Sequence, residues 1–183
     1  MATIITTYGE NAGLQSRGNS FETLARSIIG QQISVKAANS IEAKVKQAIG
    51  GLGVDNFTNT PEELLRSCGL SGQKVKYLYG LVEAEATGHF EPHHWEQDEA
   101  YVKDHLTQLK GIGPWTAEMF MIFHLLKPDI WPLGDVGLQK ALKTTFSAET
   151  PKQMAAVGQR FAPYRSVATW YLWRSLDPVP VAY

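Results

Sequence analysis

Two glycines and a carboxylate are the residues of this chain whose types and spacing are best suited to chemistry. Gly111 and Gly113 stand in a short turn between a helix that we expect to end near Leu109 and a very apolar helix that begins at Pro114. Because glycine has no Cβ, backbone N–H groups in such a turn can point outward, and the next helix N-terminus adds partial positive charge. The turn predicts a phosphate-binding site; the alternative is an ordinary helical corner whose glycines only cap.

The carboxylate is Asp135, at the end of an irregular segment from Trp131 that leads into a helix carrying Leu138, Ala141 and Leu142. Aspartate is a favoured N-cap, so a purely structural role is the alternative interpretation. A phosphate-binding turn, one apolar helix and then a carboxylate at a helix start nevertheless favour a site on DNA. In such a site one element holds the backbone while the acid faces an extruded sugar.

The charge balance requires any DNA site to be local. The chain of 183 residues has 17 Lys and Arg residues against 18 Asp and Glu residues, a formal net charge of -1. Backbone contacts position a protein on DNA without reading sequence and need few basic side chains, so the neutral total does not exclude such a partner.

The single cysteine and the hydropathy pattern exclude several other classes. Cys68 alone cannot build a disulfide framework or a four-cysteine zinc or iron–sulfur site within the chain. The start of the chain does not resemble a signal peptide, and no apolar run approaches the roughly 20 residues of a membrane span. We therefore expect a soluble, cytosolic protein.

The spacing of apolar residues predicts an all-α fold. Apolar residues recur at helical spacing in nearly every segment, and sustained period-two alternation is nearly absent. The helix boundaries that the sequence marks are starts at Asn19, Thr60-Pro61, Ser71 and Thr150-Pro151 and an end at Gly50-Gly51. Short Gly/Pro connectors separate roughly eight helices.

Several stretches together resemble the DNA glycosylase superfamily that carries a helix-hairpin-helix and Gly/Pro-rich-Asp (HhH-GPD) signature. The signature is matched by residues 109–118 followed by residues 132–135. The 3-methyladenine DNA glycosylase (AlkA-like) branch is matched further by residues 29–34, by residues 69–71 with Lys74 and Tyr77, and by residues 164–166 running into residues 170–174. The chain is too short for the N-terminal β-rich domain of the larger AlkA-like enzymes, so it is similar to the compact members.

The resemblance implies a helix-hairpin-helix glycosylase fold of eight or more helices in two lobes, with the active-site cleft between them. Residues 1–183 would form a single domain, with sub-lobes of approximately 36–130 and of 1–35 plus 131–183. The implied partner is double-stranded DNA containing damaged bases, and we expect a monomer that needs no cofactor and no membrane. A bacterial protein would be associated with the nucleoid, and a eukaryotic one would be nuclear.

The implied activity is that of a DNA-3-methyladenine glycosylase of type II, a hydrolase acting on N-glycosyl bonds in base excision repair. It would remove alkylated purines of the 3-methyladenine and 7-methylguanine type from flipped nucleotides. Asp135 would stabilise the oxocarbenium-like sugar and orient or deprotonate a water. A base alkylated on a ring nitrogen already carries positive charge, so it leaves without a dedicated general acid.

The resemblance also assigns binding residues. The base-pocket candidates are Trp115, Trp131 and Phe120, which could stack on a cationic base, and the alternative for each is core packing. Gln32, with Ile33 beside it, stands where the family inserts a wedge into the vacated stack; the alternative is polar surface. The full set of DNA-binding candidates is Gln32, Lys110, Gly111, Ile112, Gly113, Thr116 and Gly134. No metal is required, although a monovalent cation could sit at the hairpin carbonyls near Leu109 and Gly111.

Two departures bear on the chemistry. Trp115 stands where the bifunctional endonuclease III-like relatives have a lysine that attacks the sugar, so we expect no Schiff base and no strand cleavage. Met119 replaces the pocket tyrosine of some AlkA-like enzymes, which leaves the substrate range open. The alternatives are a non-catalytic helix-hairpin-helix DNA-binding module, which has no use for a carboxylate at Asp135, and a bifunctional oxidised-base glycosylase/lyase.

Overall fold

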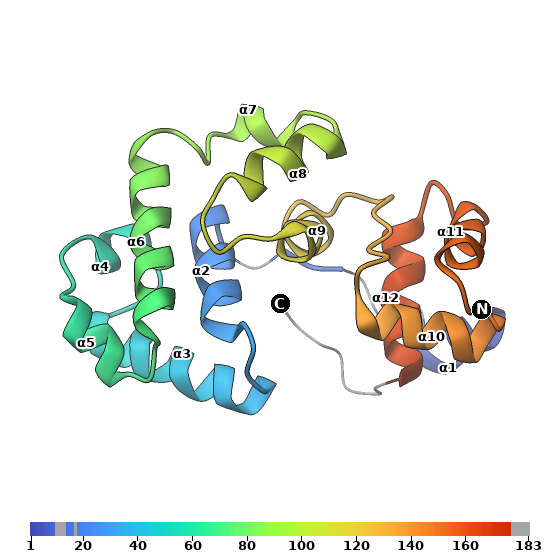
Figure 1. The fold of residues 1–183 in the computed structure, drawn as a ribbon, viewed down its shortest axis with the longest axis horizontal. Helices are drawn as coiled ribbons and strands as arrows, with labels where there is room; N and C mark the ends of the chain where they lie inside the picture. The colour runs from blue at the N-terminus through green and yellow to red at the C-terminus, as the bar shows by residue number, and fades with distance from the viewer. Residues whose placement is uncertain (10–13, 17, 177–183) are drawn as a thin grey trace. The chain divides into compact units, whose positions relative to one another are not determined.

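The computed structural model describes residues 1–9, 14–16 and 18–176, and every regular element in this part of the chain is a helix (Figure 1). The helices are α1 (Ala2–Tyr8), α2 (Ser20–Gly30), α3 (Val35–Ile49), α4 (Val54–Thr58), α5 (Glu62–Ser67), α6 (Gly72–Ala86), α7 (Pro92–Trp95), α8 (Glu99–Thr107), α9 (Pro114–Phe123), α10 (Val136–Phe146), α11 (Pro151–Gln159) and α12 (Arg165–Leu176). The expected all-α class is confirmed. Helices as short as α4, α5 and α7 are too brief for an apolar period to mark them.

Most of the helix boundaries marked by the sequence are confirmed by capping hydrogen bonds. The Asn19 side chain accepts from Glu22 N at the start of α2, and Ser71 accepts from Lys74 N at the start of α6. Thr150 forms a capping box at the start of α11, and Gly50 ends α3 in the left-handed conformation.

The cap expected at Thr60 is wrong. Helix α5 begins at Glu62, and Pro61 occupies the N-cap position without a side-chain hydrogen bond. The Thr60 hydroxyl instead donates to Asn56 O at 2.5 Å, one turn back at the end of α4. A threonine between two close helices can satisfy the first one's carbonyls, and here that local bond prevails over the cap.

The described residues divide into two compact units. The terminal unit consists of residues 1–9, 14–16 and 121–176, and the central unit consists of residues 18–120. The expected division lay near residues 35 and 130 instead. Helix α2 belongs to the central unit because it packs against α3 and α6, and the second boundary falls within α9, between Phe120 and Met121.

The central unit is built around the apolar face of α2. Phe21, Leu24 and Ile28 on this helix are almost completely buried, and α6, which packs on it, contributes Val75 and Leu78. Each such side chain contributes about 1.5–3 kcal/mol by leaving water. Helices α4 and α5 pack on α6, and α8 leads into the turn before α9 (Figure 1). The core of this unit therefore supports both the α2–α3 connection and the turn.

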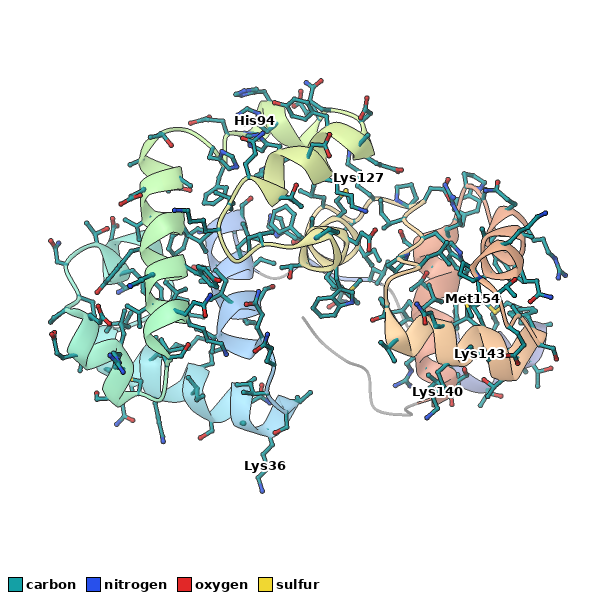
Figure 2. All side chains as sticks on the ribbon, viewed as in Figure 1. Lys36, His94, Lys127, Lys140, Lys143 and Met154 are labelled. Carbon is teal, nitrogen blue, oxygen red and sulfur yellow. The ribbon has the colours of Figure 1, made fainter. Side chains whose placement is uncertain are left out.

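The terminal unit packs α10, α11 and α12 together, with α1 against α12. Its core consists of Leu138, Ala141, Leu142, Ala148, Met154 and Leu172. Helix α10 turns this apolar stripe inward and carries the exposed Lys140 and Lys143 elsewhere on its surface (Figure 2). The start of α10, where Asp135 lies, is thus fixed by packing immediately behind it.

In the described part of the chain, none of the helices combines the length and the apolar character needed to cross a membrane.

Candidate active site

Asp135 is the N-cap of α10, as the sequence predicts. Its Oδ1 accepts a hydrogen bond of 2.6 Å from Leu138 N, in the first turn of the helix. Its side chain is half-buried, and the neighbouring Gly134 and Val136 are exposed. The carboxylate therefore lies at the surface of the terminal unit in an orientation set by the helix start, next to the partial positive charge of the helix N-terminus.

The same Oδ1 accepts a second hydrogen bond, of 2.7 Å, from Nε1 of Trp173 on α12. The Trp173 ring in turn stacks on Phe123, with ring centroids 5.8 Å apart and planes 15° from parallel. Two donors from different helices thus fix one carboxylate oxygen. Trp173 was not among the predicted site residues, because apolar periodicity cannot tell which of the tryptophans in α12 points at the acid.

Gly137 is a second residue that the sequence analysis missed. A Cβ at this position would lie 3.1 Å from Oδ1 of Asp135 and 3.3 Å from two atoms of the Trp173 ring. A side chain there would therefore press on both partners of the hydrogen bond. Gly134, which was predicted to contact DNA, has nothing within 4 Å of such a Cβ, so its backbone is open to approach.

The loop before Asp135 is held by the start of α12. The Arg165 guanidinium donates two hydrogen bonds to the Asp129 carboxylate, at 2.7 and 2.8 Å, and holds the pKa of that carboxyl below its usual value. The Ser166 hydroxyl donates to Lys127 O and accepts from Ile130 N. The segment that carries Asp135 is thus fixed at both of its ends.

In the central unit, the turn between α8 and α9 needs glycine at Gly111. This residue has φ +91, and a Cβ on it would lie 2.6 Å from Cγ of Tyr77 on α6. Gly113 has open space where a Cβ would be. The two glycines therefore serve different purposes: Gly111 allows the turn to pack on Tyr77, and Gly113 leaves the surface before α9 uncovered.

The remaining DNA-binding candidates in and after the turn differ in how far they are exposed to solvent. Lys110 is exposed, whereas Ile112 and Thr116 are buried, with 4% and 5% of their surface accessible. Any contact that Ile112 or Thr116 makes with DNA would therefore use the backbone. The first N–H groups of a helix have no intrahelical acceptor, which suits such a contact at the start of α9.

The carbonyls named for a monovalent cation both accept hydrogen bonds. Leu109 O accepts from Ile112 N at 3.0 Å, and Gly111 O accepts from Nε2 of Gln31 at 2.8 Å. A carbonyl oxygen has two lone pairs, so the cation stays a prediction. Among residues 1–9, 14–16 and 18–176, no cluster of His, Cys, Asp or Glu side chains has the arrangement of a metal site.

The predicted wedge residue, Gln32, lies in the connection between α2 and α3 and has φ +60, a left-handed conformation that is uncommon for a side-chain-bearing residue. Gln32 and the adjacent Ile33 are both exposed. The connection therefore presents a long polar side chain and an apolar one at the surface of the central unit.

The three aromatic pocket candidates have different environments. Trp115 is exposed over 37% of its surface, in the first turn of α9. Phe120 is buried against Trp95, with ring centroids 5.3 Å apart, and Trp131 donates from Nε1 to Met154 O and packs over Gly158. These placements favour packing roles for Phe120 and Trp131, and a pocket role for any of the three stays a prediction.

A groove of about 960 Å³ lies beside the turn within the central unit. Its walls come from α5, α6 and the turn, and they include Arg66, Lys76 and Lys110 as well as Glu62 and Glu83. The mixed charge of the walls agrees with the near-zero net charge of the chain. Lys110 belongs both to the wall of the groove and to the turn.

Comparison with known proteins decides the family. A family model described as "HhH-GPD superfamily base excision DNA repair protein" matches residues 25–163. The chain belongs to the HhH-GPD superfamily. The matched residues include the α2–α3 connection, the turn and Asp135, so the predicted resemblance to the superfamily is confirmed. Residues 164–166 and 170–174, which also suggested it, lie beyond the matched range.

Individual HhH-GPD proteins are similar over nearly the whole chain. DNA-3-methyladenine glycosylase 1 of Schizosaccharomyces pombe is 30% identical over 94% of this chain and 78% of its own length. The chain spans only 59% of a further relative, a putative DNA-3-methyladenine glycosylase of Bacillus subtilis.

Solved HhH-GPD structures confirm the fold. A DNA-3-methyladenine glycosidase from Bacillus halodurans matches with a TM-score of 0.83 and 35% identity, over 96% of this chain and 85% of that one. A 3-methyladenine DNA glycosylase of Schizosaccharomyces pombe in complex with abasic DNA matches with a TM-score of 0.82 and 26% identity, over 100% and 93%.

Proposed function

We propose that this chain is a monofunctional DNA glycosylase that hydrolyses the N-glycosidic bond of alkylated purines in duplex DNA. The observation that carries the proposal is the Asp135 carboxylate, one of whose oxygens is held by Leu138 N and Trp173 Nε1. Relatives named DNA-3-methyladenine glycosylases, similar over most of the chain, support the reaction and the substrate class.

The first step is extrusion of the damaged nucleotide, because the glycosidic bond cannot be reached inside a duplex. Unstacking costs a few kcal/mol, and the cost is lower for a damaged base. The exposed Gln32 would fill the vacated stack, while the backbone N–H groups around Gly113 and the side chain of Lys110 would hold a phosphate. These contacts supply the position of the sugar, and none of them selects a base.

The second step is cleavage of the bond between the sugar and the base. Positive charge develops on the sugar as the bond breaks, and the Asp135 carboxylate stabilises it electrostatically. Because two N–H donors already orient the carboxylate, little reorganisation is needed during the reaction. Asp135 then orients or deprotonates the water that attacks the sugar, and the base leaves as a neutral purine.

Selectivity follows from the leaving group. A purine alkylated at N3 or N7 carries positive charge and departs without a general acid, whereas an undamaged purine does not. Trp115, exposed in the first turn of α9, would stack on the cationic base through a cation–π attraction of about 0.5–2 kcal/mol. With tryptophan in place of a lysine nucleophile, the product is an abasic site and the strand stays intact.

The partner is therefore double-stranded DNA with alkylated bases, bound by a monomer without a cofactor. The protein would act where the chromosome lies, which is the nucleoid in a bacterium and the nucleus in a eukaryote.

The test is to incubate the protein with alkylated genomic DNA and to identify the liberated bases by mass spectrometry. We expect 3-methyladenine and 7-methylguanine to be released and no enzyme–DNA adduct to be trapped by borohydride. Binding without any base release would instead indicate a non-catalytic module, and a trapped adduct with release of oxidised bases would indicate a bifunctional lyase.

A further inference from the structure

The wedge loop, defined here as residues 31–34 between α2 and α3, is anchored to α6 by a lysine. Nζ of Lys74 donates to Ile29 O and to Gln31 O, both at 2.8 Å. These carbonyls lie at the C-terminal end of α2, where a positive charge is favourable. Lys74 is itself half-buried, and burial lowers its pKa. It therefore fixes the backbone on the N-terminal side of Gln32.

A glutamine connects the same loop to the turn between α8 and α9. Nε2 of Gln31 donates to Gly111 O at 2.8 Å, in a partly buried contact between residues 80 positions apart in the chain. The main chain of Gln31 is held by Lys74, so its side chain joins a fixed loop to the hairpin. The next residue, Gln32, is the exposed one.

Helix α6 holds both partners of this contact. Lys74 binds the wedge loop, and Tyr77, on the next turn of the helix, places its ring against Gly111. A Cβ at Gly111 would overlap that ring, so the turn and the helix approach as closely as backbone allows. Within the central unit, the wedge loop, α6 and the turn thus each contact the other two.

We propose that Gln31 and Lys74 are positioning residues that couple insertion of the wedge to capture of the DNA backbone by the turn. The inference deepens the proposed function and rests on it. A wedge loop whose backbone is already fixed to the phosphate-binding turn loses less conformational freedom when it enters the duplex. Without the link, the loop must be ordered at the moment of insertion. The fraction of complexes in which the nucleotide is extruded is then smaller.

The coupling makes a specific kinetic prediction, because extrusion costs most for a well-paired lesion and least for a mismatched one. The variant Gln31→Met keeps the length of the side chain and removes its donor. We expect it to release 7-methylguanine about tenfold more slowly opposite cytosine, which corresponds to about 1.4 kcal/mol and to the loss of one hydrogen bond. Opposite adenine, the slowing should be twofold or less. Rates are measured in single turnovers at saturating enzyme.

Gln97→Met is the matched control, since Gln97 also donates from Nε2 to a backbone carbonyl, that of His93, in the same unit. It should release both substrates at the wild-type rate. Lys74→Met should reproduce the selective slowing of Gln31→Met through the other half of the link. If a variant is partly unfolded, the unfolded fraction affects both substrates equally, so the ratio between the two rates still reports the coupling.

Equal slowing on the two duplexes, or no slowing at all, would overturn the inference while leaving the glycosylase assignment intact. Failure of the proposed function has a different signature, which is that the wild-type protein releases no base from either duplex.

Discussion

The indole of Trp173 and the carboxylate of Asp135 are joined by a hydrogen bond of 2.7 Å between α12 and the start of α10. The acceptor is Oδ1, the same oxygen that caps α10 through Leu138 N. A residue that looks like an ordinary helix cap is therefore also tied to an aromatic side chain from a distant part of the sequence. Both bonds orient the carboxylate to which we assign the catalytic role.

Replacing Trp173 separates its hydrogen bond from its packing. Trp173→Phe keeps a ring against Phe123 and removes the donor to Asp135. Because a hydrogen bond to a charged group contributes about 1.5–3 kcal/mol, we expect base release to slow by tenfold or more. The melting temperature should fall by only a few degrees. Single-turnover rates and thermal unfolding measure the two effects.

Trp170→Phe is the control for this prediction, because Trp170 lies on the same helix and packs on Tyr171 and under Arg174. It should change stability without changing the rate per folded molecule. A Trp173→Phe enzyme as fast as the wild type would show that the indole donor does not matter for catalysis.

The two glycines of the turn should respond differently to alanine. Gly111→Ala places a Cβ against Tyr77 at a positive φ, which costs about 1–2 kcal/mol for the backbone conformation alone. The melting temperature should drop by about 2–4 °C for each kcal/mol lost. Gly113→Ala has room in the fold, so its melting temperature should stay close to the wild type.

Affinity for abasic duplex measures the second half of this prediction. The methyl group of Gly113→Ala would stand where a phosphate approaches, so binding should weaken although the fold is intact. If Gly113→Ala bound DNA as tightly as the wild type, the turn would not contact the backbone in the proposed way.

Stacked imidazoles on α7, on α8 and in the turn before α7 make the stability of the central unit depend on pH. His89 lies 3.7 Å from His105, centroid to centroid, and His105 lies 4.0 Å from His94, whose position on α7 is labelled in Figure 2. Burial first, and then the charge of His105, lower the pKa of His89 below its usual 6.5. Burial likewise lowers the pKa of His94.

The unfolded chain therefore binds more protons than the folded one just below pH 6.5. The free energy of unfolding should be constant above that pH and should fall as the pH drops through 6.5 toward the lower folded pKa, by at most about 1.4 kcal/mol per pH unit for each proton. His89→Gln should flatten the decline in urea unfolding series between pH 8 and pH 5. The control Gln97→Met, which leaves all the imidazoles in place, should keep it. Identical slopes for wild type and His89→Gln would contradict this account.

The features that were predictable from sequence depend on neighbouring residues. The helical class, the caps at Asn19, Ser71 and Thr150, and the N-cap position of Asp135 follow from periodicity and from short-range hydrogen bonds. The cap at Thr60 was wrong because two short helices compete there for one hydroxyl. Patterns among neighbouring residues therefore predict helix boundaries well, and they fail where two helices follow each other closely.

The features that were missed depend on contacts between distant segments. Trp173 reaches Asp135, Gln31 reaches Gly111, and Tyr77 packs under that same glycine only after the helices have packed. The resemblance included these stretches, yet no spacing in the sequence says which side chain meets which. The division into units depends on the same kind of contact, since α2 joins the central unit through its packing on α3 and α6.

The most direct test of the central claim is Asp135→Asn. Asparagine can accept both N–H groups through its own Oδ1, so the cap and the bond from Trp173 persist and the melting temperature should stay within a few degrees of the wild type. We predict that the variant binds abasic duplex DNA with wild-type affinity and releases no 7-methylguanine from methylated DNA in single turnovers. Release at the wild-type rate would contradict the account, because a neutral amide cannot stabilise the developing charge on the sugar.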